Sequence, residues 1–452
     1  MNQLLRKYNV PGPRYTSYPT VPYWSVTPSA GQWIESIGQA LDEGASQGVG
    51  AAVYIHIPFC ESLCTYCGCN TRITRNHGVG LPYVDVVIKE WELYLEKLGR
   101  KIPIGELHLG GGTPTFLAVS ELEHLMKGIL SRATVLPGAE FSVEADPRVT
   151  KREHLEALAH LGFKRLSLGI QDFDPKVQEA VHRVQSEEQV KRVTEEAREL
   201  GYTSINYDLI YGLPFQTRES IENTIAAVKR LRPDRIAFYS YAHVPWIKPG
   251  QRRFTEADLP NGDEKRALYE LGRAALEAVG YAEIGMDHFA LASDSLSKAA
   301  KTGALHRNFM GYTSRQVSPL IGLGVSAIGD SWTVFAQNEK LLETYQARVE
   351  KGEIPILRGH VLDEEDRIIR RHVLNLMTRF ETSWKEGGLQ TPFLKDVPEK
   401  LGEFVQDGLI QLAGYTCIVT EKGKPYLRNI CMAFDARLAR QAPNTQLFSK
   451  TI

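Results

Sequence analysis

The chain has 452 residues, of which 43% are hydrophobic and 24% charged, and its formal net charge is -1. A chain of this length buries a large core and has room for two domains. The balanced charge and the absence of a long apolar run argue against a nucleic-acid partner, a membrane-surface partner and a membrane span.

The first fifty residues are rich in Pro, Tyr and Ser and predict an extended arm with one helix. From about residue 51 to 242, short apolar runs alternate with segments whose apolar residues recur every three or four positions, as in amphipathic helices. The predicted strands are AAVYIHI, ELHLGG, FSVEAD, RLSLGIQ, INYDLIYG and RIAFYSYA. Six successive βα units require a parallel sheet, which is either doubly wound or a full or partial barrel.

Glycine or polar chemistry appears at the end of each predicted strand. A cysteine cluster follows the first, GGGTPT the second, Glu144 and Asp146 the third, and Gln171 the fourth, with Asp208 in the fifth. Ligands bind at the carboxyl ends of parallel strands, so this pattern favours one shared cavity. We therefore predict an α/β fold with a partial (βα)6 TIM-like barrel that has an open side.

Beyond residue 242 the alternation breaks. Residues 243–355 contain a helical segment and the Gly-rich LIGLGVSAIGDS, and we expect them to close the cavity. A small, mainly helical C-terminal domain is predicted, with helices in EEDRIIRRHVLNLMTRF and EKLGEFVQDGLI and a hairpin around LAGYTCIVTEKGKPYL. The expected units are the arm and helix at 1–50, the barrel with its extension at 51–355, and the C-terminal domain at 356–452.

Four of the six cysteines lie within ten positions, and Cys60, Cys64 and Cys67 have the spacing CxxxCxxC. A structural zinc site usually takes its ligands from two separated pairs, and no second pair is present. The other two cysteines, Cys417 and Cys431, lie far downstream without evident partners, which is not the layout of a secreted disulfide framework, so we expect a reducing, cytoplasmic compartment. Thiolates also hold iron-sulfur clusters, and three of them leave one iron open to S-adenosylmethionine. Cys69 as a fourth ligand, which would close the cluster, is the weaker alternative.

The triad is followed by further motifs in a fixed order, namely HLGGGTPT, SVEADP, LGIQ, INYDLIYGLP and RNICMAFD, and is preceded by GPRYTSYPT. With these motifs the chain resembles the radical S-adenosylmethionine (SAM) superfamily and, within it, the oxygen-independent coproporphyrinogen III oxidases, from about Tyr8 onward. The resemblance implies oxidative decarboxylation of coproporphyrinogen III to protoporphyrinogen IX in haem biosynthesis. It also implies a [4Fe-4S] cluster, two SAM molecules and a flavodoxin- or ferredoxin-type electron donor, and we expect a monomer.

The same resemblance assigns roles to individual residues. Besides the three cluster cysteines, it implies that the cluster-bound SAM contacts Tyr54, Gly111, Glu144 and Ile328. It implies that a second SAM contacts Tyr66, Gly112, Thr113, Gln171, Arg183, Asp208 and Ala242. Cys69 and Tyr54 are the candidate catalytic residues, Cys69 on the substrate side.

The residues alone leave plainer interpretations open. The glycines of GGGTPT also fit an ordinary turn, Glu144 a salt bridge at the barrel rim, and Arg183 a surface ion pair. Tyr54 also fits a core aromatic residue and Cys69 a small buried one.

Two further segments carry polar anchors. The arm GPRYTSYPT would fold over the cavity mouth with Arg14 meeting a propionate, although structural packing explains it equally well. Arg307 and Tyr312 in HRNFMGYT are candidates for lining the substrate cavity.

The alternative functions are a haem-trafficking chaperone, which generally lacks the fourth cysteine and the arm, a haem-degrading methyltransferase relative, and a structural zinc protein.

Overall fold

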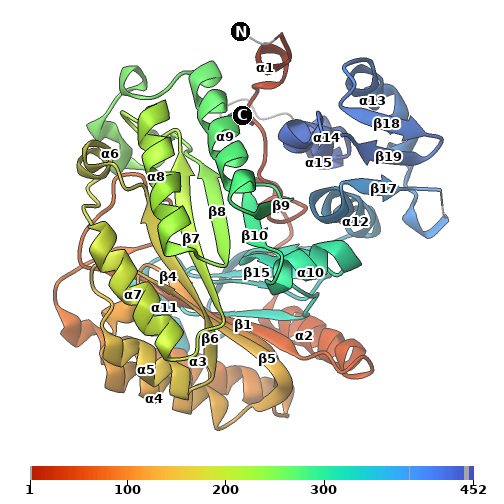
Figure 1. Cartoon of the computed structure of the whole chain (residues 1–452). Helices are drawn as coiled ribbons and strands as arrows, with labels where there is room; N and C mark the ends of the chain where they lie inside the picture. The colour runs from red at the N-terminus through yellow and green to blue at the C-terminus, as the bar shows by residue number, and fades with distance from the viewer. Residues whose placement is uncertain (1–2, 386, 442–446, 452) are drawn as a thin grey trace.

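In the computed structural model, which describes residues 3–385, 387–441 and 447–451, twelve strands form one sheet (Figure 1). The six strands that the sequence predicts are parallel and lie side by side in chain order. They are β1 (Ala51–Ile57), β4 (Pro103–Gly111), β5 (Thr134–Ala145), β6 (Phe163–Gln171), β7 (Ser204–Tyr211) and β8 (Arg235–Ser240). The predicted α/β fold with a parallel βα sheet is confirmed. The end strands β9 and β16 do not pair with each other among the described residues, so the sheet is open.

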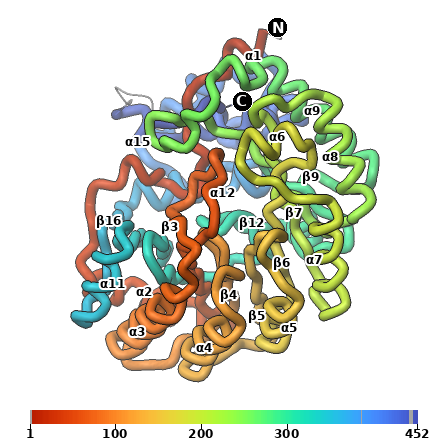
Figure 2. The backbone as a smooth tube through the Cα atoms, turned by 90° about the vertical axis from the view of Figure 1, so that its left-hand side faces the viewer, coloured from red at the N-terminus to blue at the C-terminus, as the bar shows by residue number. Residues whose placement is uncertain are grey.

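Helices follow the parallel strands and cover the outside of the sheet (Figure 2). They are α3 (Gly80–Leu98), α4 (Val119–Leu130), α5 (Arg152–His160), α6 (Pro175–Ala180), α7 (Glu187–Glu199) and α8 (Arg218–Leu231). Helix α7 illustrates how these helices pack on the strands. Its residues Val190, Val193 and Ala197 lie on one face and are fully buried, as in an amphipathic helix. No helix in the described ranges combines the length and apolar character needed to cross a membrane.

Both ends of the parallel sheet are extended by later strands. Strand β10 (His288–Leu291) pairs antiparallel with β8, and β9 (Tyr281–Gly285) follows it. At the other end β13 (Leu320–Leu323) pairs parallel with β1. The remaining elements of this region are α9 (Gly262–Ala278), α10 (Ser295–Thr302), the hairpin of β11 (His306–Asn308) and β12 (Gly311–Thr313), β14 (Ile328–Asp330), β15 (Val334–Asn338), α11 (Leu342–Glu350) and β16 (Ile356–Val361). Because β16 pairs with β15, the boundary expected after residue 355 falls inside the sheet.

The C-terminal unit combines helices with a three-stranded antiparallel sheet in the order β17-β19-β18. Its elements are α12 (Glu364–Arg379), β17 (Glu381–Ser383), α13 (Val397–Gln406), β18 (Ile410–Ala413), β19 (Thr416–Val419), α14 (Leu427–Ala433) and α15 (Ala436–Arg440). The predicted hairpin corresponds to β18 and β19. Residues 1–2, 386, 442–446 and 452 of the expected units lie outside the described residues.

The N-terminal arm packs on this C-terminal unit. The arm begins with a short helix that the sequence did not indicate, α1 (Gln3–Tyr8), and the predicted helix is α2 (Ala30–Ala45). Tyr8, Tyr15 and Tyr18 are buried in the same apolar cluster as α12, α13 and α14. The Tyr15 hydroxyl donates a hydrogen bond of 3.0 Å to Asp435. Two segments at opposite ends of the sequence therefore share one core.

Candidate active site

A cavity of about 640 Å³ opens at the carboxyl ends of the parallel strands and continues along their inner face. Side chains at alternate positions line it, because successive residues of a strand point to opposite faces. On β4 these are Glu106 and His108, and on β7 they are Ser204, Asn206 and Asp208. The β11–β12 hairpin adds Met310, Tyr312 and Thr313. The extension therefore contributes to the cavity wall, as the sequence predicts.

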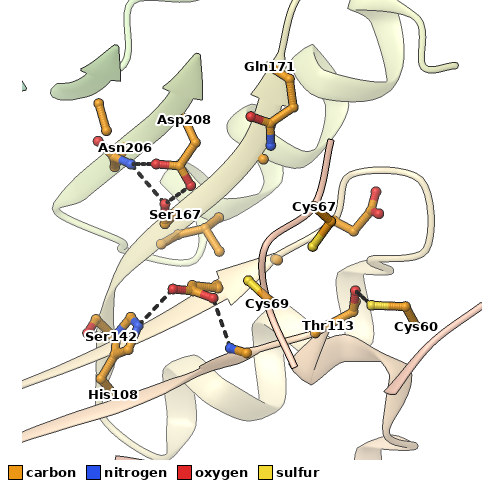
Figure 3. A pocket seen from close by; sticks show the side chains of 18 of the residues that line it. Cys60, Cys67, Cys69, His108, Thr113, Ser142, Ser167, Gln171, Asn206 and Asp208 are labelled. Carbon is orange, nitrogen blue, oxygen red and sulfur yellow. Dashed lines mark hydrogen bonds and ion pairs between the residues drawn. The ribbon is translucent and has the colours of Figure 1, made fainter. Parts of the chain in front are cut away.

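The cysteine loop, residues 58–74, forms one rim of the cavity. It leaves β1, makes the two-residue strand β2 (Phe59–Cys60), and is fixed by pairing with β3 (Arg72–Ile73). All four thiols of the loop are free and border the cavity. Figure 3 shows Cys60, Cys67 and Cys69 on one side of the cavity and Ser167, Asn206 and Asp208 on the other.

The surroundings of these thiols are cationic and polar. The Arg148 and Arg183 guanidinium groups each lie 3.7 Å from Cys64 Sγ. Hydrogen bonding to Cys69 lowers the pKa of the Cys67 thiol to about 6, against the effect of burial. Burial raises the pKa of Cys60 to about 11, although its sulfur lies 3.5 Å from the Thr113 hydroxyl.

The donor set at this rim fits an iron-sulfur cluster in kind. Soft thiol donors from three positions of one loop face one cavity, which is the ligand type that such clusters take. The Arg183 charge helps to lower the pKa of the Cys67 thiol, and the thiolate is the form that a metal requires. In the described ranges, no group of three or more His, Cys, Asp or Glu side chains is already gathered as a metal site. The fit therefore lies in the chemistry of the donors and in their shared cavity.

Glu144 at the end of β5 is the centre of a hydrogen-bonded group. Its carboxylate accepts from the Gly111 backbone N–H at 3.0 Å and pairs with His108 Nε2 at 3.2 Å. The Tyr54 ring stacks on His108, and its hydroxyl lies 3.0 Å from His56 Nδ1. Burial opposes ionisation, but the His108 and Gly111 contacts outweigh it and lower the pKa of Glu144. Glu144 thus presents a charged carboxylate at the strand ends rather than a rim salt bridge with Lys or Arg.

A second polar group lies across the cavity on β6 and β7. Asp208 accepts hydrogen bonds from the Ser167 hydroxyl at 3.1 Å and from Asn206 Nδ2 at 2.9 Å (Figure 3). Burial and the negative charge of Glu144 raise the pKa of Asp208 to about 7. Gln171 ends β6 with a φ of +70° and lines the same cavity. Asp208 is therefore poised between its neutral and charged forms near neutral pH.

Arg183 is buried, which differs from the surface ion pair that its sequence context also allowed. Only 6% of it is exposed, and its guanidinium pairs with Asp146 at 3.0 Å and donates to the Gly169 carbonyl. Arg148 binds the same carboxylate at 2.7 Å. Burial disfavours the charged carboxylate, but the two guanidinium groups outweigh it and lower the pKa of Asp146 to about 2. Two cations are therefore held beside Cys64 by one buried acid.

The other predicted site residues fall into two sets. Tyr66, Gly112 and Thr113 line the cavity, as do Gly111, Glu144, Gln171, Arg183 and Asp208. Tyr54, Ala242 and Ile328 do not belong to its lining. Tyr54 reaches the site through His108, and the Ala242 carbonyl accepts from Gln251 Nε2, which also binds the Tyr66 carbonyl.

Sequence reasoning missed several residues of the site. His108, Arg148, Ser167 and Asn206 contact the predicted residues directly. The period-two alternation of polar residues along the strands contains the signal for His108, Ser167 and Asn206. Arg148 follows β5 in a turn, where no pattern marks it.

Comparison with known proteins identifies the class of enzyme that has this fold and this site. The radical SAM superfamily signature matches residues 54–228, which run from β1 into α8. The fold and the cysteine-lined cavity are those of a radical SAM enzyme.

Relatives that match almost the full length of the chain identify its family within this superfamily. Oxygen-independent coproporphyrinogen III oxidases from Pseudomonas aeruginosa and Escherichia coli K12 are each 39% identical to this chain, over 99% of it and 98% of their own length. The solved structure of coproporphyrinogen III oxidase (HemN) from Escherichia coli, a radical SAM enzyme, has a TM-score of 0.87 and 38% identity. It matches 94% of this chain and 97% of its own. The chain belongs to the oxygen-independent coproporphyrinogen III oxidase family.

Proposed function

We propose that this enzyme catalyses the oxidative decarboxylation of coproporphyrinogen III to protoporphyrinogen IX without oxygen. The observation that carries the proposal is the CxxxCxxC loop at the rim of a polar cavity, in a chain that matches relatives of this name over almost its full length. Two propionate side chains each become a vinyl group, so each loses carbon dioxide, one hydrogen atom to a radical derived from SAM, and one electron to an electron acceptor.

Cys60, Cys64 and Cys67 are the proposed ligands of a [4Fe-4S] cluster. With SAM, such a cluster supplies a 5′-deoxyadenosyl radical, which removes hydrogen from carbon centres that acid-base groups cannot activate. The Arg183 and Arg148 guanidinium groups beside Cys64 offset the negative charge of the thiolates. The loop pairing of β2 with β3 fixes the position of the first ligand.

Residues of the cysteine loop, of the strand ends and of their surroundings are the proposed binding groups for two SAM molecules. Glu144 and the Gly111 backbone offer a charged acceptor and a close backbone approach, and Tyr54 and Ile328 are the other proposed contacts of the cluster-bound SAM. Tyr66, Gly112, Thr113, Gln171, Arg183, Asp208 and Ala242 form the proposed second site. A carboxylate such as Asp208 suits an ammonium or a ribose hydroxyl, and enclosure by the strand ends keeps water from the reacting carbon.

Cys69 and Tyr54 stay candidates for catalysis. Cys69 borders the cavity next to Cys67, where a thiol is placed to pass a hydrogen atom or an electron to the substrate side. A flavodoxin- or ferredoxin-type protein is the proposed electron donor, and the enzyme is proposed to act as a monomer.

The test is turnover of the anaerobically reconstituted enzyme with coproporphyrinogen III, SAM and a reductant. Protoporphyrinogen IX should form with about two deoxyadenosine molecules per product, because two decarboxylations each need one radical. Cys64→Ala should lose both the activity and the brown absorbance of the cluster, whereas Cys69→Ala should keep the cluster. Haem retention without turnover, or a ratio near one, would contradict the proposal.

A further inference from the structure

A cluster of basic side chains surrounds Asp287, in the turn that precedes β10. Arg14 comes from the arm, Lys265 from α9, Arg307 from β11 and Arg428 from α14. All four act on one carboxyl group: burial raises the pKa of Asp287, and the four cations lower it. Figure 1 shows the arm passing between α9 and α14, where these elements meet. Three guanidinium groups and the Lys265 amine thus act on one acid, and burial together with Arg14 and Arg428 lowers the pKa of that amine to about 7.

The hydrogen bonds of these cations go to neutral groups. Arg14 Nη2 donates to the Ser240 carbonyl at 2.6 Å, and Lys265 Nζ donates to the next carbonyl, that of Tyr241, at 2.9 Å. Arg428 Nε donates to the Pro13 carbonyl at 2.9 Å, which fixes the residue next to Arg14. Among the described residues, none of the four cations forms an ion pair with a carboxylate.

Arg307 is the least satisfied member of the cluster. Its guanidinium lies over the Tyr312 ring at 4.6 Å, and only 8% of the residue is exposed. Its Nε and Nη1 atoms are buried and have no hydrogen-bond partner. Leaving charged donors buried without a partner destabilises a protein, so such groups persist where a ligand completes them.

The cluster adjoins the active-site cavity. His288, which follows Asp287, lies 3.3 Å from the Tyr239 hydroxyl, and both side chains line the cavity together with Tyr312. Arg307 lies behind this wall, close enough to act on the pKa of Tyr239, His288 and Tyr312. The cluster is therefore separated from the cavity by the side chains of Tyr239, His288 and Tyr312, and none of its four basic residues lines the cavity itself.

We propose that Arg14, Lys265 and Arg307 bind a carboxylate of the substrate that the reaction leaves intact. This inference rests on the proposed function, in which a substrate with four propionates loses only two. Carboxylates that stay in the product are suited to orientation, because their contacts persist while another ring reacts. A planar guanidinium with free donors matches the two oxygens of such a group, and the Lys265 amine supplies a further N–H donor. Arg428 positions Arg14 through the backbone of the arm.

Two probes are compared. Coproporphyrin III is stable and fluorescent and keeps all four carboxylates, and its tetramethyl ester has none of them free. Binding to the full-length cluster-loaded enzyme is measured by fluorescence under anaerobic conditions. The wild type should bind the acid at least about tenfold more tightly than the ester, the usual effect of a charged hydrogen bond. Arg307→Gln and Arg14→Gln should weaken binding of the acid by a similar factor and leave binding of the ester unchanged.

Two controls separate binding from folding. Arg273→Gln removes a half-buried cation on α9 that is paired with Glu270 and Glu277, and Arg6→Gln removes an exposed cation of the arm. Both should keep the wild-type preference for the acid. The ligand-free Arg307→Gln protein should unfold at no lower temperature than the wild type, because its partnerless charge is gone.

The outcomes distinguish this inference from the proposed function. If Arg307→Gln and Arg14→Gln bind the acid as tightly as the wild type, the carboxylate site is refuted even if the enzyme makes protoporphyrinogen. A lower unfolding temperature of Arg307→Gln with an unchanged preference for the acid would assign the residue a purely structural role. If the wild-type enzyme does not convert coproporphyrinogen III, but Arg307→Gln and Arg14→Gln lose the preference for the acid over the ester, the carboxylate site is supported and the proposed function is refuted.

Discussion

Replacing Arg235 by Met should destabilise the barrel, because it leaves a buried acid without its partner. Arg235 at the start of β8 pairs with Asp294 at 2.7 Å, and their side chains are only 4% and 2% exposed. Asp294 also accepts hydrogen bonds from the Ser204 hydroxyl and from the Leu296 backbone N–H, both at 2.8 Å, and so caps α10. The ion pair therefore joins β7, β8 and α10.

Removing one partner of a buried ion pair costs about 3–5 kcal/mol. The entropy of unfolding is about 2.1 cal/mol/K per residue, which for 452 residues amounts to about 0.9 kcal/mol/K. Arg235→Met should therefore unfold about 3–5 °C below the wild type. The assay is thermal unfolding followed by circular dichroism, with Arg273→Met as the control at a half-exposed ion pair, for which a loss below about 1 kcal/mol is expected.

The double variant makes this reasoning refutable. Asp294→Asn removes the charge but keeps an oxygen that can accept the Leu296 N–H. If the unpaired charge causes the loss, Arg235→Met combined with Asp294→Asn should be more stable than Arg235→Met alone. Strictly additive losses, or a double variant less stable than Arg235→Met, would show that packing rather than charge governs this position.

Three further outcomes are expected. Burial raises the pKa of Glu106 from 4.5 to about 7, so the stabilising contribution of its protonated form is present below pH 4.5 and is lost as the pH rises through 7. In urea titrations, the free energy of unfolding of Glu106→Gln should therefore rise by up to about 3 kcal/mol relative to that of the wild type between pH 4.5 and 8. Parallel pH profiles of the two proteins would contradict this. Gly111→Ala should lower the affinity for SAM measured by calorimetry, because at a φ of +110° the added Cβ would lie 2.7 Å from the His56 ring. In the control Gly303→Ala the added Cβ has no atom within 4 Å, so this variant should bind SAM normally and lose only about 1 kcal/mol of stability. Tyr15→Phe should make the arm more sensitive to limited proteolysis by about tenfold, since a buried hydrogen bond contributes about 1 kcal/mol or more; unchanged cleavage would show that packing alone holds the arm.

The parallel strands were predictable because their signals are local. An apolar run such as AAVYIHI followed by an amphipathic segment reports a buried strand and its covering helix, and the carboxyl ends of such strands meet. That rule alone brought Glu144, Gln171 and Asp208 to one cavity, as observed. The cysteine spacing was equally local, because one short loop carries all the proposed ligands.

What could not be predicted depends on contacts between distant segments. The arm was open to two interpretations, because nothing near Tyr15 in the sequence reveals that its hydroxyl meets Asp435. Arg183 resembled a surface residue until Asp146 and the Gly169 carbonyl were found around it. The extent of the sheet was also missed, since β16 is short and pairs only with β15, which no local pattern specifies.

The cations of the barrel form two groups, those paired with acids, which include Arg148 and Arg183 on Asp146 at the carboxyl ends, and those that meet only neutral groups. Near the amino ends of the strands, Arg235 pairs with Asp294 and Arg165 pairs with Glu140 at 2.8 Å, so cation and acid neutralise each other and serve the fold. Beyond the carboxyl end of β8, Arg14 and Lys265 meet carbonyl groups instead of acids. Arg14 and Lys265 are half-buried, whereas Arg307 is buried with two donors that have no hydrogen-bond partner, and a buried charge without a counterion is costly. Their persistence is best explained by an anion that arrives with the substrate.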